Sequence, residues 1–399
     1  MMSLDLERIE KLGAQIAAIA ERIEDEIPVS VLAPLNEKEE LAKVREHFEN
    51  KSGPYNPQFV FDDGAQNATD ILENIQGFLA SLRPTSNSLQ GRIEAAYWEK
   101  AQEQYYSVLS RLSRSPGLLT AVTALTYGLP KRALVKLAQE HLTQSKIESQ
   151  ESDKEVKAEE VLPQIQSLLR RVGFEDWKVV LREVAVSNFA TAPAAKEIRL
   201  KSGDTISLNR LKGMIIRQIA TNVERARNGE QNRRALPFLI EKGLLGYQVT
   251  EFGLGAFMEA KLTGQFDHEQ LRDYAARYLA AQVCLSGTFY DGFNAIQEYV
   301  GVEKALSIVT RIKRGFSDTS EPGGHLQIIL YWDGYHKVKE HLLQHPDDLP
   351  LLFIGKIGLQ DLPLIKELVN ERLVNLPPRL PEQITQIVHD VFSSTLSND

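Results

Sequence analysis

The stretch LNRLKGMIIRQIATNVERARNG, residues 208–229, decides the fold of this chain. Apolar residues recur along it at steps of three and four, which predicts an amphipathic helix with one buried stripe. That stripe consists of Leu208, Leu211, Ile215, Ile219 and Val223. Asn228 and Gly229 then predict that the helix ends near residue 227.

Three polar residues, Gln218, Asn222 and Arg225, follow the edge of this stripe. Their side chains are therefore expected at the boundary between core and surface, where a catalytic helix would carry its functional groups. A second stretch, GLLGYQVTEFGLG at residues 243–255, follows after a short linker.

Together the two stretches resemble the metal-binding segments of the tubulin tyrosine carboxypeptidase-like metallopeptidases, whose bacterial members are also called flavohaemoglobin-expression-modulating QEGLA-motif proteins. That family carries HExxxH on such a helix, and a later Glu-Gly-Leu-Ala segment whose glutamate completes a zinc site. The resemblance places the HExxxH positions on Arg217, Gln218 and Asn222. It places the glutamate on Phe252 and the closing alanine on Gly255.

Further segments extend the resemblance over most of the chain. In order, they are Leu35-Asn36, Glu39-Glu40, YNPQF at 55–59, YGLP at 127–130, Arg314-Gly315, PGG at 322–324 and YWDG at 331–334.

The residues at the degenerate positions cannot perform the chemistry that the family implies. A guanidinium such as that of Arg217 has no lone pair for a metal, and Asn222 offers only a poor amide ligand. Gln218 cannot accept a proton as a general base, and Phe252 offers no donor. Glu251 lies one residue before the expected ligand, but one carboxylate with one amide does not make a zinc site. We therefore expect no catalytic residue, no metal and no other cofactor, and favour a protein that is not an enzyme.

A cleft for a peptide or protein ligand is still expected on this scaffold. Its candidate residues are Arg217, Tyr247, Glu251, Arg314, His325 and Tyr331. Arg217 would pair with Glu251, or hold a terminal carboxylate with its two-pronged guanidinium. The alternative is that Arg217 forms only an internal ion pair, and that Glu251 is a surface acid or one at a helix N-terminus.

Composition narrows the classes of protein that remain. The net charge of −8 argues against nucleic-acid binding. The sequence has no run of 18 apolar residues, so no membrane-spanning helix is expected. The single cysteine, Cys284, lies in an apolar helical run and is expected to be buried. These features predict a cytoplasmic protein, and leave its oligomeric state open.

The expected fold is α+β and predominantly helical, with a zincin-like metallopeptidase core and a small antiparallel sheet near residues 177–200. A helical N-terminal region over 1–145, a charged linker over 146–157 and a metallopeptidase-like domain over 158–399 are predicted.

Three functions remain open at this stage. The first is an inactive pseudopeptidase whose cleft binds a ligand. The second is an enzyme with a different, metal-independent activity in the same cavity, which a strongly shifted His325 or Glu251 in a deep pocket would favour. The third is an interaction or regulatory protein acting through its N-terminal helices, which an exposed apolar patch on helix 4–25 would favour.

Overall fold

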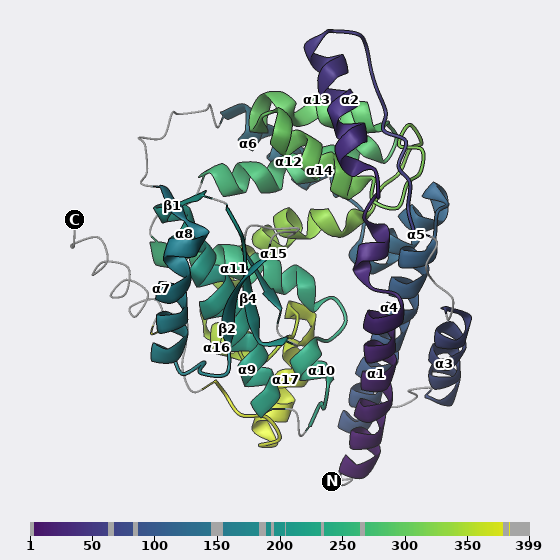
Figure 1. Ribbon diagram of the computed structural model, residues 1–399. Helices are drawn as coiled ribbons and strands as arrows, with labels where there is room; N and C mark the ends of the chain where they lie inside the picture. Colours follow the sequence, from purple (N-terminus) through teal and green to yellow (C-terminus); the bar gives the residue numbers. More distant parts are fainter. Residues whose placement is uncertain are drawn as a thin grey trace, which may run out of the picture.

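The computed structural model describes residues 4–62, 68–82, 87–144, 155–182, 189–192, 195–203, 205–232, 235–263, 268–377 and 383. The described chain is predominantly helical with a few short strands (Figure 1). Its longer helices are α1 (Leu6–Glu26), α2 (Glu37–Glu49), α3 (Ala68–Ser81), α4 (Leu89–Leu112), α5 (Pro116–Tyr127), α6 (Arg132–Gln144), α7 (Ala158–Arg171), α8 (Leu208–Ile215), α9 (Glu224–Gln231), α11 (Tyr247–Thr263), α12 (His268–Cys284), α13 (Phe289–Val300), α14 (Val302–Ile312), α15 (Leu330–Gln344) and α17 (Leu362–Asn370). The short helices are α10 (Leu239–Lys242) and α16 (Leu349–Leu352), and the 3-10 turn η4 (Leu326–Ile329) precedes α15.

The described part of residues 1–145 is built mainly of the helices α1 to α6. Pro116 occupies the first turn of α5, where proline has no missing hydrogen bond. Helix α1 lies beside α4 (Figure 1), and its apolar residues are buried: Ile9, Leu12, Ile16 and Ile23. The exposed apolar patch that would favour the third function is therefore not found on this stripe.

The sheet near residues 177–200 is mixed, not purely antiparallel as predicted. Strand β4 (Glu197–Lys201) lies between β2 (Lys178–Arg182), which is parallel to it, and β3 (Phe189–Ala192), which is antiparallel. The chain reverses direction after β2 and again after β3, so β4 runs the same way as β2. Phe189 to Ala192 was not predicted as a strand.

A second, two-stranded sheet pairs β1 (Glu155–Lys157) with β5 (Thr205–Ser207). Residues 155–157 were predicted as the end of a linker, because they are polar and charged. Backbone pairing makes this segment a strand. The rest of the predicted linker lies outside the described residues, and the division into two domains stays a prediction.

The stretch that decides the fold forms one continuous helical segment over residues 208–231, longer than the predicted 208–227. Its middle, η3 (Ile216–Val223), is a π-helix between α8 and α9. The predicted apolar stripe is confirmed as part of a core with α7 and the mixed sheet. Gly229 does not end the helix. Its role is in packing, because a Cβ atom at this position would lie 2.3 Å from the carbonyl oxygen of Ile240.

Helices α11 and α15 cross closely at two glycines. A Cβ atom at Gly253 would lie 2.1 Å from the carbonyl oxygen of Gly334, and one at Gly334 would lie 2.1 Å from that of Val249. Only glycine permits this backbone approach. Both glycines belong to the segments that carry the family resemblance, so these motif residues are explained by helix packing.

The N-terminal segments of the resemblance also have a structural role. Glu40 is buried, and its carboxylate accepts hydrogen bonds from the Tyr55 hydroxyl and the Gln58 backbone, both at 2.8 Å. Asn36 donates to the Gln58 carbonyl and accepts from the backbone of Val60. These contacts fasten α2 to the segment YNPQF.

Cys284 is buried, as predicted, and burial raises the pKa of its thiol to about 12. Among the helices that the structure describes, none has both the length and the apolar character needed to cross a membrane.

Candidate functional site

The π-helix η3 gives the predicted metal helix an unusual geometry. In an α-helix, residues five apart point about 140° away from each other. In a π-helix, each backbone N–H bonds to the carbonyl five residues earlier, so residues five apart share a face. Arg217 and Asn222 have this spacing within η3. The Thr221 hydroxyl also donates to the carbonyl of Ile216, five residues earlier, at 3.2 Å.

Arg217 leaves η3 toward α11 and α12. Its Nε and Nη2 atoms donate to one carboxylate oxygen of Glu259 at 3.0 and 2.5 Å. Its remaining donors reach the Tyr274 hydroxyl at 3.1 Å and the Gln270 side chain at 2.5 Å. Burial opposes the charge of the guanidinium, but Glu259 outweighs that effect, and the pKa of Arg217 lies above its usual value.

A glycine makes room for the Arg217 side chain. A Cβ atom at Gly255 of α11 would lie 2.6 Å from Cγ of Arg217. Such a distance is too short for two carbon atoms without a shift of one of them.

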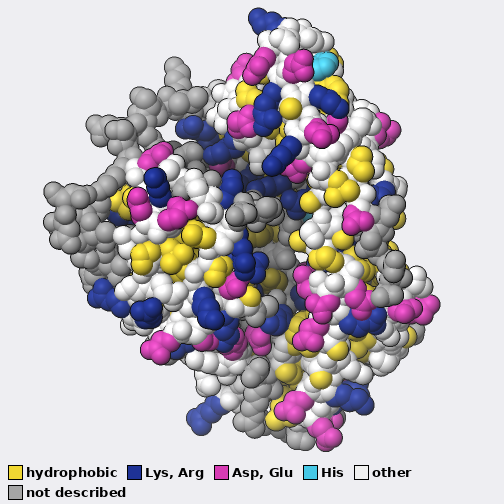
Figure 2. All heavy atoms as spheres, viewed as in Figure 1, with side chains coloured by type: hydrophobic (Ala, Val, Ile, Leu, Met, Phe, Trp, Pro, Cys, Tyr) yellow, Lys and Arg dark blue, Asp and Glu magenta, His cyan; other side chains and the backbone are white. Residues whose placement is uncertain are grey.

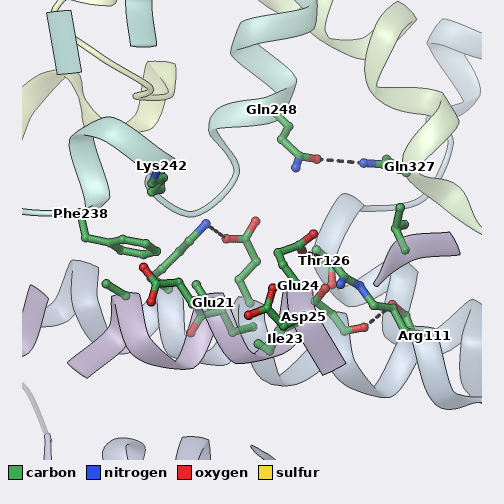
Figure 3. Close-up of a pocket in the computed structure, with 18 of the residues that line it drawn as sticks. Glu21, Ile23, Glu24, Asp25, Arg111, Thr126, Phe238, Lys242, Gln248 and Gln327 are labelled. Carbon is green, nitrogen blue, oxygen red and sulfur yellow. Dashed lines mark hydrogen bonds and ion pairs between the residues drawn. The ribbon is translucent and has the colours of Figure 1, made fainter. Parts of the chain in front are cut away.

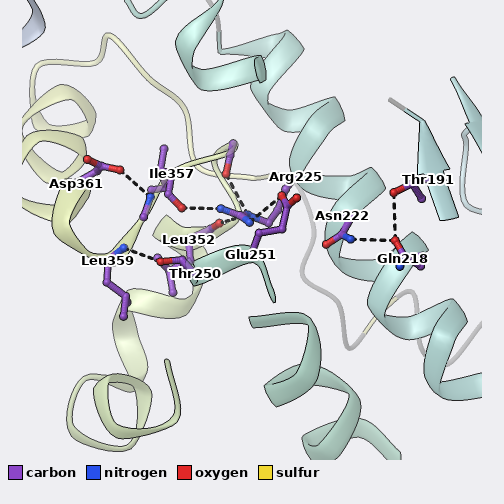
Figure 4. Close-up of polar contacts among 12 residues, drawn as sticks. Thr191, Gln218, Asn222, Arg225, Thr250, Glu251, Leu352, Ile357, Leu359 and Asp361 are labelled. Carbon is purple, nitrogen blue, oxygen red and sulfur yellow. Dashed lines mark hydrogen bonds and ion pairs between the residues drawn. The ribbon is translucent and has the colours of Figure 1, made fainter. Parts of the chain in front are cut away.

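Gln218 and Asn222 bind each other. The Asn222 amide donates to Oε1 of Gln218 at 2.9 Å, and the Thr191 hydroxyl of β3 donates to the same oxygen at 3.1 Å (Figure 4). The Asn222 Oδ1 atom is buried and has no hydrogen-bond partner among the described residues.

Phe252 is part of an aromatic group around Tyr331. The two rings stack, with centroids 4.4 Å apart and planes 16° from parallel. Tyr274 lies 5.1 Å from Tyr331 on centroids, and the Arg277 guanidinium lies 4.5 Å from the Tyr331 ring centroid. Arg217 and Phe252 are therefore joined through Tyr274 and Tyr331.

Three half-buried arginines gather near Tyr331: Arg277, Arg311 and Arg314. Burial lowers the pKa of Arg311, and the positive charges of Arg277 and Arg314 lower it further. Arg277 and Arg314 make no ion pair with any described residue, and Glu37 is the acid whose charge favours Arg311 and Arg314. In Figure 2, Lys and Arg side chains gather along the upper edge of the central hollow, below the region of α2, α13 and α14.

Glu251 does not pair with Arg217, and it is not a surface acid. Glu251 lies in the second turn of α11, which begins at Tyr247. The carboxylate of Glu251 pairs with Arg225 of α9 at 3.1 Å (Figure 4). Only 12% of the Glu251 side chain is exposed, and Arg225 is fully buried. The expected pairing with Arg217 was wrong because Glu259, two helical turns further along α11, takes that place.

Arg225 also binds the chain that follows α16. Its guanidinium donates to the carbonyl oxygens of Leu352, Gly355 and Ile357 at 3.0, 3.1 and 2.6 Å. On the same helix, Asn228 donates to the carbonyl of Phe353 at 2.8 Å. One face of α9 thus holds the backbone of residues 352–357 in place.

Asp361 lies beside this group and gives stability a pH dependence. Burial raises its pKa from 3.8 to about 7, although a hydrogen bond from the Gly358 backbone opposes the shift. The folded state therefore keeps the proton to higher pH than the unfolded chain does. The stabilisation is complete below pH 3.8 and is lost as the pH rises through about 7.

We expect Asp361→Asn to remove this dependence. The difference in unfolding free energy between the native chain and the variant should fall by about 2 kcal/mol from pH 5 to pH 8, a value reduced for partial exposure of the carboxyl. Urea denaturation at both pH values measures it. A difference that stays constant with pH would contradict the expectation.

Tyr247 and His325 have no contact with the Tyr331 ring among the described residues. Tyr247 lies near Lys100 and Lys356, each 5.7 Å from its ring centroid. His325 is 7% exposed and lies 6.0 Å from the Tyr127 ring on centroids. Of the six predicted cleft residues, the structure thus joins Arg217 to Tyr331, with Arg314 nearby. Tyr247 and Glu251 lie near Arg225 instead, and the charge of Arg314 acts on His325.

Several residues of these groups were not predicted: Glu259, Gln270, Tyr274, Arg277 and Arg311. Only Arg277 had a signal in the sequence, because it follows Tyr274 by three residues and so shares its helix face. Among the described residues, no group of three or more His, Cys, Asp or Glu side chains is placed to hold a metal ion.

The frame of two motif helices and the ordered segments around it define a carboxypeptidase-like protein. The family model described as microtubule-associated tyrosine carboxypeptidase matches residues 46–393. Since this match spans most of the 399 residues, the chain belongs to that family. No curated protein matches the chain.

Proposed function

We propose that this protein is a catalytically inactive member of its carboxypeptidase family, and that it binds a peptide or protein ligand instead of cleaving it. The ion pair between Arg217 and Glu259 carries the proposal. It puts a permanent cation at the position that the sequence predicts for the first histidine of HExxxH. All three nitrogen atoms of this guanidinium donate hydrogen bonds.

The residues at the predicted metal positions do not fit a zinc ion. Zinc needs three ligands with free lone pairs, arranged around one open position. Arg217 has none. Asn222 offers a single neutral amide oxygen, while its amide nitrogen donates to Gln218, and Phe252 is stacked on Tyr331. The π-helix spacing of positions 217 and 222 suits a pair of ligands, which supports descent from a metal site.

Changes at Arg217 and Gly255 support the same history. The family has histidine and alanine at the two corresponding positions, by the resemblance above. Here the larger Arg217 faces the smaller Gly255, and an alanine would meet it at 2.6 Å. Two departures from the motif that fit one another indicate a site that has been rebuilt for packing, since a chance loss of one ligand would not alter its neighbour.

The arginines near Tyr331 provide the binding chemistry. Arg277 and Arg314 are half-buried and have no paired acid among the described residues, so an anionic group would be attracted to them. The adjacent rings of Phe252 and Tyr331 offer an apolar surface. A peptide with a free carboxylate and an aromatic terminal residue suits both, in keeping with the tyrosine carboxypeptidase name of the family.

The test combines metal analysis, a cleavage assay and peptide binding. Purified protein should contain no stoichiometric zinc and release no tyrosine from a peptide that ends in tyrosine. The same peptide should bind, and its C-terminal amide should bind about tenfold more weakly, because the carboxylate charge is lost. Fluorescence anisotropy of the labelled peptide measures both affinities.

Arg277→Met and Arg314→Met should each weaken peptide binding about tenfold. Arg132→Met, at an exposed site of α6, removes the same charge elsewhere and should leave binding unchanged. Tightly held zinc or released tyrosine would refute inactivity. Equal binding of the acid and the amide would refute the arginine site.

A further inference from the structure

A cavity of about 950 Å³ lies outside the group formed by Arg217, Phe252 and Tyr331 (Figure 3). Helices α1 and α4 form one side of it, and α10, the start of α11 and η4 form the other. Arg217, Phe252 and Tyr331 do not line it, whereas His325 does. In Figure 3, Glu21, Glu24 and Asp25 of α1 lie across the cavity from the hydrogen-bonded side chains of Gln248 and Gln327.

The charged groups of this cavity leave two acids without a cation. Five acids and three bases line it. Each base already pairs with one of these acids: Lys100 with Glu103 at 2.5 Å, Arg111 with Glu24 at 2.7 Å, and Lys242 with Glu241 at 2.9 Å. Glu21 and Asp25 remain, and neither forms an ion pair with a described residue. The lining therefore carries a net charge of −2, from five negative and three positive groups.

Two buried residues with polar side chains, Gln104 and His325, also line the cavity. Gln104 is 7% exposed, and its Oε1 atom has no hydrogen-bond partner among the described residues. A buried acceptor without a partner is unfavourable, so a ligand that donates to it gains affinity. His325 is equally buried and makes no side-chain hydrogen bond to another described residue.

The remaining wall is apolar. It comprises Ala17, Ala20, Ile23, Val29, Leu32, Pro237 and Phe238. Phe238 has a φ of +68°, a backbone conformation that residues other than glycine adopt at a cost in energy. Such local strain is often retained where it positions a side chain for binding. An apolar wall next to unpaired carboxylates suits a ligand with a methylene chain and a charged end.

From these contacts we infer that the cavity between α1, α4 and α10 binds an alkylammonium cation, such as a polyamine or the side chain of a lysine in a peptide. Its ammonium group lies between Glu21 and Asp25, and a second donor reaches Gln104 or His325. The methylene chain lies along the wall formed by α1 and Phe238. This inference does not rest on the proposed function, because the two sites share no residue.

His325 acts here as a neutral acceptor and not as a catalytic base. Burial, together with the positive charge of Arg314, lowers its pKa to about 3. At neutral pH the imidazole carries no charge that would repel a cation, and it is too weak a base for efficient proton transfer. A pocket is present at His325, but the lowered pKa of this residue fits binding better than catalysis.

Calorimetric titration of the full chain with spermidine, and separately with acetyl-Ala-Lys-Ala-amide, tests the inference. Low ionic strength is needed because salt screens charges near the surface. We expect one saturable site per chain. Glu21→Gln with Asp25→Asn should weaken binding at least about tenfold, and Gln104→Met should weaken it by a smaller factor.

A matched control removes the same charge elsewhere. Glu10→Gln with Glu371→Gln changes two exposed acids that do not line the cavity, and should leave the affinity unchanged. Thermal unfolding of each variant confirms that it is folded. Because Glu21 and Asp25 are exposed, their double variant is expected to fold even if Gln104→Met does not.

The outcomes separate the two sources of the cation. Saturable binding of spermidine that depends on Glu21 and Asp25 supports a free polyamine. Binding of the lysine peptide alone supports a peptide side chain in the same cavity. If neither probe saturates, or if the control variant weakens binding as much as the cavity variant, the inference is wrong.

Discussion

Replacing Arg225 with methionine is expected to lower the free energy of unfolding by about 3–5 kcal/mol. The side chain is fully buried and donates to three backbone carbonyls as well as to Glu251. Methionine fills much of the volume but supplies no donor. Three buried carbonyls and a largely buried carboxylate would then lose a partner without gaining water.

Urea denaturation of the native chain and of Arg225→Met measures the loss. Arg227→Met is the matched control, because Arg227 lies on the same helix and contacts the Phe174 ring at 5.2 Å, but makes no hydrogen bond or ion pair with a described residue. Its loss should cost about 1 kcal/mol or less. Arg225→Lys keeps the charge with fewer, differently placed donors and should fall between the two. A loss below about 1 kcal/mol for Arg225→Met would show that the carbonyls find other partners.

The helices and their buried faces were largely predictable from the sequence, because they depend on local spacing. The stripe from Leu208 to Val223 and the stripe of α1 are buried as expected. The predominantly helical character was predictable from the same local spacing. The family was predictable because its motifs occur in order along the chain.

What the sequence could not supply are features set by contacts between distant segments. The π-helix packs against α11, and no local pattern in the sequence predicted its geometry. Arg217 had two acids of α11 as plausible partners, and sequence spacing could not decide between Glu251 and Glu259. The parallel pairing of β2 with β4 depends on β3, which is only four residues long.

The arginine group near Tyr331 was missed for the same reason. Arg277 lies on α12, while Arg311 and Arg314 lie at the end of α14 and just beyond it. Only the fold brings these arginines around one aromatic ring, which is why Arg314 alone was predicted, through its motif.

Gly255→Ala is the second substitution with a large expected effect, and its size should depend on Arg217. In the native chain, the added methyl group would meet Cγ of Arg217 at 2.6 Å. We expect a loss of about 1–3 kcal/mol, because α11 or the arginine must shift. Arg217→Ala alone should cost about 2–4 kcal/mol through the lost ion pair and hydrogen bonds.

The double variant discriminates between coupled and independent changes. With Arg217→Ala, the Cγ atom is absent, so Gly255→Ala should add little. The loss in the double variant should therefore be smaller than the sum of the two single losses by about 1–2 kcal/mol. Gly77→Ala is the control, since a methyl group on that α3 glycine meets nothing within 4 Å and should stabilise the helix slightly. Strict additivity would mean that Arg217 and Gly255 changed independently. Non-additivity would instead tie the replacement of the predicted metal position to the replacement of its neighbour, as expected if the former site now serves the packing of α11.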